Sequence, residues 1–163
     1  AEDQDAMVTK LEGMQAKIQM VQALFKNKEE MEFVIATIPT QLAISESSRL
    51  LTSLRTSEIP CKRIVVNQCI TDSTQHTYLK LKLKDQRRSM DVIRNDPALR
   101  ALTQLEAPFL DMEVRGVPAL QYFGQMVWGG AIEEMPRGEG RKYFMLGGKG
   151  GVGKTSSAAS LGV

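Results

Sequence analysis

The strongest constraint on how this chain folds is a glycine-rich segment near its end. Eight consecutive residues follow the pattern G-x-x-x-x-G-K-[ST], namely Gly148-Lys149-Gly150-Gly151-Val152-Gly153-Lys154-Thr155. The apolar segment 142–146 precedes them, and the residues from Lys154 onward suit a helix. A strand, a glycine-rich turn and a helix in this order are typical of a loop that holds phosphate groups.

The residue types in this segment explain how such a loop would hold a nucleotide. Glycines let successive backbone N–H groups turn inward around phosphates, because a Cβ atom would clash in the conformations required. The positive end of the following helix adds to the attraction. We expect Lys154 to reach the β- and γ-phosphates of ATP and the Thr155 hydroxyl to coordinate Mg²⁺. The alternative is a glycine-rich turn that binds no ligand.

The composition is that of an ordinary globular protein and excludes several classes. With 163 residues, of which 42% are hydrophobic and 25% charged, the chain is large enough to bury a core. A net charge of +2 is too small for a polyanion-binding protein, so we expect no nucleic-acid partner. No apolar run approaches the roughly 20 residues of a membrane-spanning helix, and the N-terminus is acidic rather than signal-like. We therefore expect a soluble, cytoplasmic protein.

Hydrophobic spacing predicts a strand–helix–strand unit in the first half of the chain. The run Phe33–Ile38 is apolar on both faces, as in a buried parallel strand, and Pro39 stops it. A helix over 41–57 follows, with the apolar residues Leu42, Leu50, Leu51 and Leu54 on one side, and then a strand over 63–67. Because parallel strands end at the same edge of a sheet, Asn67 is expected at the edge where ligands bind.

The second half of the chain continues the alternation and is then interrupted. We expect a helix over 78–93, a strand over 109–114 and a closing helix over 117–128. Residues 129–140 are rich in Gly and Glu and contain Pro136, which is the composition of a linker. The predicted fold class is therefore α/β, with a parallel sheet flanked by helices.

The residues of the glycine loop resemble a known family. A lysine directly after the first glycine, here Lys149, marks the deviant Walker A subgroup of P-loop NTPases, the SIMIBI type. The segment RKYFMLGGKGGVGKTSSAASLGV resembles the P-loop of the ATPase family that contains the arsenite-pump ATPase and the tail-anchored-protein targeting ATPase. The earlier segments FVIATIPTQLAISESSRLLTSL, KRIVVNQ and APFLDMEVRG resemble the C-terminal half of the same nucleotide-binding domain.

The order of these segments is the reverse of their order in a family member, whose P-loop comes first. We therefore interpret the chain as an incomplete fragment that spans the junction of a tandem protein. Residues 1–128 would be the C-terminal portion of one nucleotide-binding half, 129–140 the linker, and 141–163 the P-loop start of the second half. A designed circular permutant is the alternative. As a junction, the chain alone would hydrolyse ATP at no more than a background rate.

The resemblance implies roles for individual residues. The counterpart of Lys149 reaches across to the nucleotide of the opposite half, so Lys149 and Lys154 are the candidate catalytic residues. Asn67, next to Gln68, would lie beside the adenine, with Pro108 and Phe109 on its other side. The alternative is that Asn67 only caps a strand and Pro108 only begins an edge strand. The candidate nucleotide-binding residues are thus Gly148, Lys149, Gly150, Gly151, Val152, Gly153, Lys154, Thr155, Ser156, Asn67, Pro108 and Phe109.

The family resemblance leaves two functions open. The first is an ATPase that captures the transmembrane segments of tail-anchored clients under nucleotide control, and the second is the ATPase of an arsenite efflux pump, which works with a membrane transport subunit. Both imply ATP or ADP and a second ATPase half as partners. A third hypothesis is a partitioning or division-site ATPase that uses the same loop on a membrane or DNA surface. The N-Q and E-V-R-G segments argue against it. Cys61 and Cys69 form no disulfide framework, zinc pattern or metalloid triad, which weakens the arsenite reading.

An amphipathic stripe near the N-terminus bears on the same choice. Apolar residues recur at spacings of four and three, which predicts a helix with one apolar face. We expect this face to be part of the core, and the alternative is that it lies beside a groove for client helices, since methionines suit variable apolar partners. The residues of the stripe are Met7, Leu11, Met14, Ile18, Val21 and Phe25.

Overall fold

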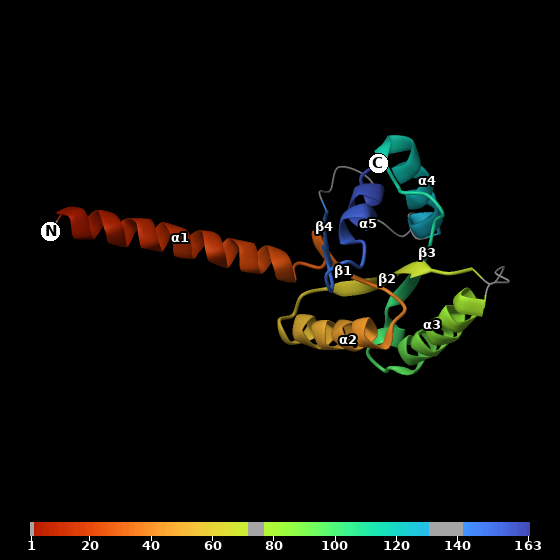
Figure 1. The fold of residues 1–163 in the computed structure, drawn as a ribbon. Helices are drawn as coiled ribbons and strands as arrows, with labels where there is room; N and C mark the ends of the chain where they lie inside the picture. The colour runs from red at the N-terminus through yellow and green to blue at the C-terminus, as the bar shows by residue number, and fades with distance from the viewer. Residues whose placement is uncertain (1, 72–76, 131–141) are drawn as a thin grey trace.

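A computed structural model describes residues 2–71, 77–130 and 142–163 of the chain (Figure 1). Its helices and strands alternate along the sequence, as the hydrophobic pattern predicts. In chain order they are α1 (Glu2–Lys26), β1 (Met31–Thr37), α2 (Gln41–Thr56), β2 (Cys61–Cys69), α3 (Thr77–Asn95), a 3₁₀ turn (Leu99–Ala101), β3 (Thr103–Pro108), α4 (Gly116–Trp128), β4 (Tyr143–Gly147) and α5 (Lys154–Leu161). Residues 131–141, most of the expected linker, lie outside the described part.

The strands form one parallel sheet in the order β3-β2-β1-β4. Strand β1 pairs with β2 on one side and with β4 on the other, so that Ile35 lies between Ile64 and Gly147. Helices α2 and α3 cover one face of the sheet, and α4 and α5 cover the other (Figure 1). The expected α/β fold with a parallel sheet flanked by helices is confirmed.

Each face of the sheet has its own apolar core. Every residue of β1 is buried, and alternate side chains point to opposite faces because the side-chain period of a strand is two. Ile35 packs with Ile64 and with Ile44 of α2 on one face. Val34 packs with Val65 and with residues of α4 on the other. This burial on both faces explains why the strand is apolar without alternation.

Charges are buried where β1, β2 and β4 begin. The Glu32 carboxylate accepts two hydrogen bonds from Nη1 of Arg63, at 2.5 and 2.6 Å, and both side chains are almost completely buried. Lys142, which directly precedes β4, has its ammonium 3.9 Å from the same carboxylate. A buried carboxylate needs such partners, since an unpaired charge there would be very costly. The group therefore ties the start of β4 to β1.

Two details of the sequence interpretation are wrong. The expected strand over 109–114 is replaced by β3 at Thr103–Pro108, and Phe109 follows it. Strand β3 is an edge strand with polar residues on its exposed side, so its sequence is less apolar than the segment that follows, and hydropathy alone favoured the wrong one. Leu42, expected inward on α2, is exposed, whereas Leu51 and Leu54 are buried.

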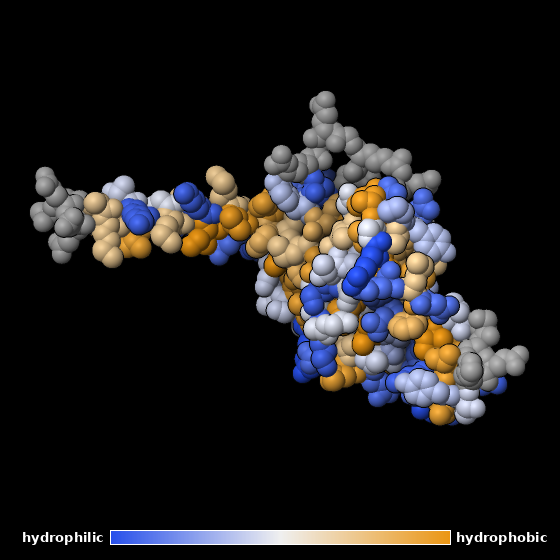
Figure 2. All heavy atoms as spheres, turned by 45° about the horizontal axis from the view of Figure 1, so that its top comes forward, coloured by the Kyte–Doolittle hydropathy of each residue, from blue (hydrophilic) through white to orange (hydrophobic). Residues whose placement is uncertain are grey.

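The expectation that the N-terminal stripe belongs to the core is also wrong. Helix α1 extends away from the sheet (Figure 1), and Figure 2 shows apolar side chains exposed along it, with hydrophilic side chains between them. The apolar residues of α1 between positions 7 and 21 are 47% to 75% exposed. No helix in the described parts of the chain is long and apolar enough to cross a membrane. The exposed residues of the predicted stripe, here called the α1 stripe, are Met7, Leu11, Met14, Ile18 and Val21.

Candidate functional site

The glycine-rich loop, residues 148–153, leaves the carboxyl end of β4 and is pressed against its neighbour β1. A Cβ atom added to Gly148 would lie 2.0 Å from the carbonyl oxygen of Ala36, so only glycine fits there. At the other end of the loop the Val152 side chain is 1% exposed and anchors the turn in the protein. Gly153 then begins α5 in the left-handed conformation, with φ 84°, which favours glycine. Both ends of the loop are thus held.

The middle of the loop is open. Lys149, Gly150 and Gly151 are exposed, and Cβ atoms added to the two glycines would meet nothing within 4 Å. Lys154 crosses the loop, and its ammonium donates to the carbonyl oxygen of Lys149 at 2.8 Å. A cation, the N-terminus of α5 and unobstructed backbone form a surface that suits polyphosphate.

The two residues after Lys154 lie in the first turn of α5. Thr155 is exposed, which leaves its hydroxyl accessible to a metal ion, and Ser156 is half-buried. These positions fit a phosphate-bound Mg²⁺ held at the start of the helix.

Asn67 reaches the loop from the end of β2. Its Nδ2 donates to the carbonyl oxygen of Val152 at 3.2 Å, across 85 residues of sequence. Its Oδ1 accepts from the backbone N–H of Gln68 at 2.9 Å, and Gln68 has a left-handed φ of 62°. The pairing of β2 with β3 shifts register between Val66 and Cys69, and a bulge of this kind re-aims side chains. The structure therefore brings Asn67 and the loop together.

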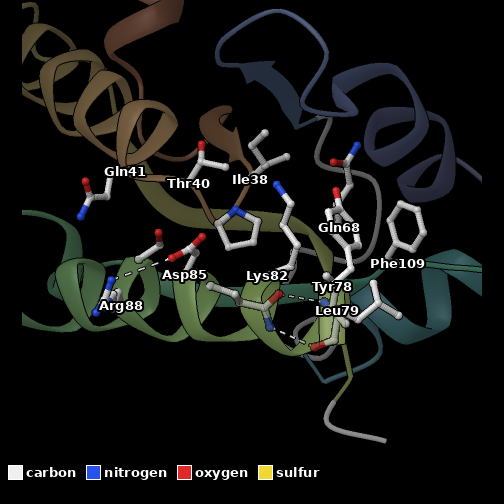
Figure 3. A pocket seen from close by; sticks show the side chains of 14 residues that line it. Ile38, Thr40, Gln41, Gln68, Tyr78, Leu79, Lys82, Asp85, Arg88 and Phe109 are labelled. Carbon is white, nitrogen blue, oxygen red and sulfur yellow. Dashed lines mark hydrogen bonds and ion pairs between the residues drawn. The ribbon is translucent and has the colours of Figure 1, made fainter. Parts of the chain in front are cut away.

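A cavity of about 630 Å³ opens at the same edge of the sheet, between α3 and the ends of β1 and β2 (Figure 3). Gln68 and Phe109 both line it, and Lys82 of α3 points its ammonium into it toward Ile38. Phe109 is 61% exposed, and its backbone N–H donates to the carbonyl oxygen of Cys69 at 2.8 Å. Pro108 ends β3 and lines a separate hollow. Gln68 and Phe109 thus share a cavity, and Pro108 lies outside it.

Helix α4 holds the helix that follows the loop, a contact that the sequence interpretation missed. The indole N–H of Trp128, which is completely buried, donates to Oγ of Ser160 at 3.1 Å. A Cβ atom added to Gly124 would lie 2.5 Å from the backbone oxygen of Ser160, so the two helices approach closely at this glycine. In the sequence, the glycine at position 124, close to the single tryptophan at 128, is the feature that could have predicted this close contact between helices.

The two cysteines are poorly placed to share a metal or metalloid. They are the first and last residues of β2, which places them roughly 25 Å apart at the usual rise per strand residue. Burial raises the pKa of the Cys61 thiol to about 11 and that of Cys69 to about 12. Both thiols are therefore protonated at neutral pH and weak as ligands. Within the described ranges no group of three or more His, Cys, Asp or Glu residues is arranged to hold a metal ion.

Comparison with known proteins decides the family. The family model of the anion-transporting ATPases matches residues 1–129, which is most of the chain. The chain belongs to this ATPase family. The resemblance noted from its segments is thereby confirmed.

The relatives described next are longer than this chain. ATPase ARSA1 of Chlamydomonas reinhardtii is 54% identical over 162 residues, which are 99% of this chain and 21% of that protein. ATPase GET3B of Arabidopsis thaliana is 48% identical over 120 residues, 73% of this chain and 29% of that protein. ATPase GET3C of the same plant is 38% identical over 126 residues, 77% of this chain and 32% of that protein. The chain thus spans about a fifth to a third of the length of these relatives.

The close approach of Gly148 to β1 generates a prediction. We expect Gly148→Ala to lower the free energy of unfolding by roughly 1–3 kcal/mol, because the added methyl group meets the Ala36 carbonyl and forces the strands apart. Gly150→Ala is the matched control, since its methyl group enters open space, and it should stay within about 0.5 kcal/mol of wild type. Urea titration measures both values. Equal stabilities of the two variants would contradict the described packing of β4.

Proposed function

We propose that the chain contributes a site for ATP and Mg²⁺ to a larger ATPase of this family. The observation that carries the proposal is the meeting of Asn67 with the glycine-rich loop, two segments far apart in sequence, at the carboxyl edge of a parallel sheet. Ligands of open α/β sheets bind at this edge. A glycine-rich turn with no ligand would not need a buried asparagine from β2, which is separated from β4 by β1.

Within this site the polyphosphate lies against the open loop and the start of α5. The Lys154 ammonium exchanges its bond to the Lys149 carbonyl for the β- and γ-phosphates, which offer it full negative charge. The Thr155 hydroxyl holds the Mg²⁺, and Ser156 contributes to the same turn. The metal, when bound, neutralises charge that develops on the γ-phosphate during transfer to water. The loop residues Gly148, Lys149, Gly150, Gly151, Val152 and Gly153 supply the backbone of the cradle.

The base of the nucleotide lies on the β2 side of the loop. The adenine would lie near Asn67 and Gln68 and against Phe109 from the β3–α4 connection. The shared cavity of Gln68 and Phe109 supports this placement, because it is large enough for a nucleoside and lies at the same edge. Pro108 supports the turn that carries Phe109.

The whole protein is a tandem of two nucleotide-binding halves, of which this chain spans the junction. In this proposal residues 1–128 end one half, 129–140 link the halves and 141–163 begin the second, so the site described above combines the last strands of the first half with the loop of the second. The lengths of the relatives support it. Since 162 residues are 21% of ARSA1 whereas 120 residues are 29% of GET3B, ARSA1 is nearly twice as long as GET3B, as expected of a tandem protein. Lys149, exposed on the loop, is then available to reach the nucleotide of the opposite half.

Nucleotide binding is tested on the 163-residue chain itself. We expect Mg·ATP to bind, and Lys154→Ala to weaken binding by about tenfold to a hundredfold, because a charge-assisted hydrogen bond to phosphate is lost. Thr155→Ala should weaken binding in the presence of Mg²⁺ and leave it unchanged in EDTA. Isothermal titration calorimetry measures both effects. Wild-type protein that binds no Mg·ATP would contradict the proposed site.

The function that the family and the exposed α1 stripe support best is the cytoplasmic capture and membrane delivery of tail-anchored clients under control of the nucleotide. A row of half-exposed methionine, leucine and isoleucine side chains lies on the projecting helix and exposes apolar surface to water. Such a surface suits the transmembrane helix of a client, and methionine adapts to varied partners. Relatives that bear the name GET3 support this branch of the family.

The ATPase of an arsenite or anion efflux pump, coupled to a membrane transport subunit, is the second candidate. The description of the family as anion-transporting and the name ARSA1 favour it. The two cysteines of this chain are protonated and widely separated, so they do not support it, since a metalloid ion is bound by neighbouring thiolates. We therefore rank it second.

The intact protein discriminates between these functions. Leu11→Asp and Ile18→Asp should each reduce capture of a tail-anchored client by about tenfold, because an apolar side chain no longer leaves water on binding. Ala16→Asp, on the opposite side of α1, is the matched control and should capture normally. All three variants should bind Mg·ATP like wild type. Activation of the ATPase by arsenite, with no client capture, would remove the targeting function.

A further inference from the structure

The side chain of Asn67 is already engaged within the protein before any nucleotide is considered. It is 8% exposed, its Nδ2 donates to the Val152 carbonyl, and its Oδ1 accepts from the N–H of Gln68. Gln68 lies within the register shift of β2 and has a left-handed conformation, which a non-glycine residue adopts at some cost. The chain thus accepts a strained residue where it turns the Asn67 amide toward the loop.

The Asn67–Val152 hydrogen bond determines the direction of a backbone donor. In a planar trans peptide the C=O of one residue and the N–H of the next point in opposite directions. With the Val152 carbonyl held toward Asn67 and β2, the N–H of Gly153 therefore points away from β2. This N–H directly precedes α5, where the donors of a phosphate-binding loop are concentrated.

The rest of the loop has few such constraints. Lys149, Gly150 and Gly151 are exposed, and the space beside the two glycines is empty. Gly153 carries no Cβ because that atom would lie 2.0 Å from Nδ2 of Asn67, so glycine at this position makes room for the amide. Asn67 and the buried Val152 side chain are thus what fixes the exit of the loop.

We propose that Asn67 is a positioning residue for the phosphate loop: it orients the Val152–Gly153 peptide so that the donors next to it face the polyphosphate. This inference rests on the nucleotide site proposed above and adds a role that is independent of the base. Removal of the Asn67 amide then weakens the binding of any Mg·polyphosphate ligand, with or without adenine.

The test compares ligands that share phosphates and differ in the base. Affinities for Mg·ATP, Mg·CTP and Mg·tripolyphosphate are measured by displacement of a fluorescent nucleotide from wild type, Asn67→Ala and Phe109→Ala. Asn67→Ala should weaken all three ligands by a common factor of about threefold to tenfold, as expected for one buried hydrogen bond. Phe109→Ala provides the contrast, because a residue that contacts only the base should weaken ATP and leave tripolyphosphate unchanged.

The opposite pattern would overturn the inference. If Asn67→Ala weakened ATP alone and left CTP and tripolyphosphate unchanged, Asn67 would act only on adenine. Asn67→Asp is a second variant: it keeps the acceptor for Gln68 and loses the donor for Val152, so it should bind the three ligands no more tightly than Asn67→Ala. Emission of the sole tryptophan, Trp128, verifies that each variant retains the packing of α4 against α5.

A measurement without nucleotide separates this inference from the proposed function. Hydrogen–deuterium exchange of ligand-free protein should be faster in Asn67→Ala than in wild type at the amides of Gly153 and of the first turn of α5. Unchanged exchange there would contradict the positioning role even if ATP binds. Failure of wild type to bind Mg·ATP would instead refute the nucleotide site. Faster exchange in Asn67→Ala would in that case still support the Asn67–Val152 hydrogen bond.

Discussion

The arrangement of the molecule depends on the parallel pairing of β1 with β4. Strand β1 is buried along its whole length, and its second edge is covered by the strand that carries the glycine-rich loop. Because parallel strands end at a common edge, this pairing delivers the loop to the side of the sheet where β2 ends. Without it, the loop would be a flexible turn with no partner for either of its ends.

Several unrelated contacts hold the paired strand and its loop in place. At the start of β4 a buried carboxylate, Glu32, is shared between Arg63 and Lys142. At the end of β4 the loop rests on the Ala36 carbonyl and on the Asn67 amide. Beyond the loop, Trp128 holds α5 through Ser160. The anchors lie at the edges of the loop, and the exposed middle remains available to a ligand.

The sequence was informative where local chemistry decides the conformation. The loop, the buried strand β1 and the β1–α2–β2 unit were predicted, because glycine spacing and apolar runs are local signals. Strand β3 was misplaced because only one of its faces packs in the core, through Leu105 and Ala107, so its sequence is not a continuous apolar run. The α1 stripe was assigned to the core because helical spacing shows only that a helix has an apolar face. The spacing is the same whether that face packs against the rest of the fold or is exposed.

The sequence predicted the individual residues of the candidate site, but not the contacts between them. That Asn67 lies at the ligand-binding edge followed from strand direction, but its bond to Val152 depends on a bulge and on strand order, which periodicity does not report. The Glu32–Arg63 ion pair could have been predicted from the sequence, since each charged residue lies in or beside an apolar strand. A charged residue in each of two neighbouring buried strands indicates a pair.

The central claim is that the loop, assembled against β1 and β2, holds the polyphosphate of a nucleotide. A crystal structure of this chain with ADP and Mg²⁺ tests it most directly. The account predicts phosphates within hydrogen-bonding distance of the loop amides and of Lys154, with β4 beside β1 and Asn67 on the Val152 carbonyl. An empty loop at saturating ADP, or β4 detached from β1, would contradict it.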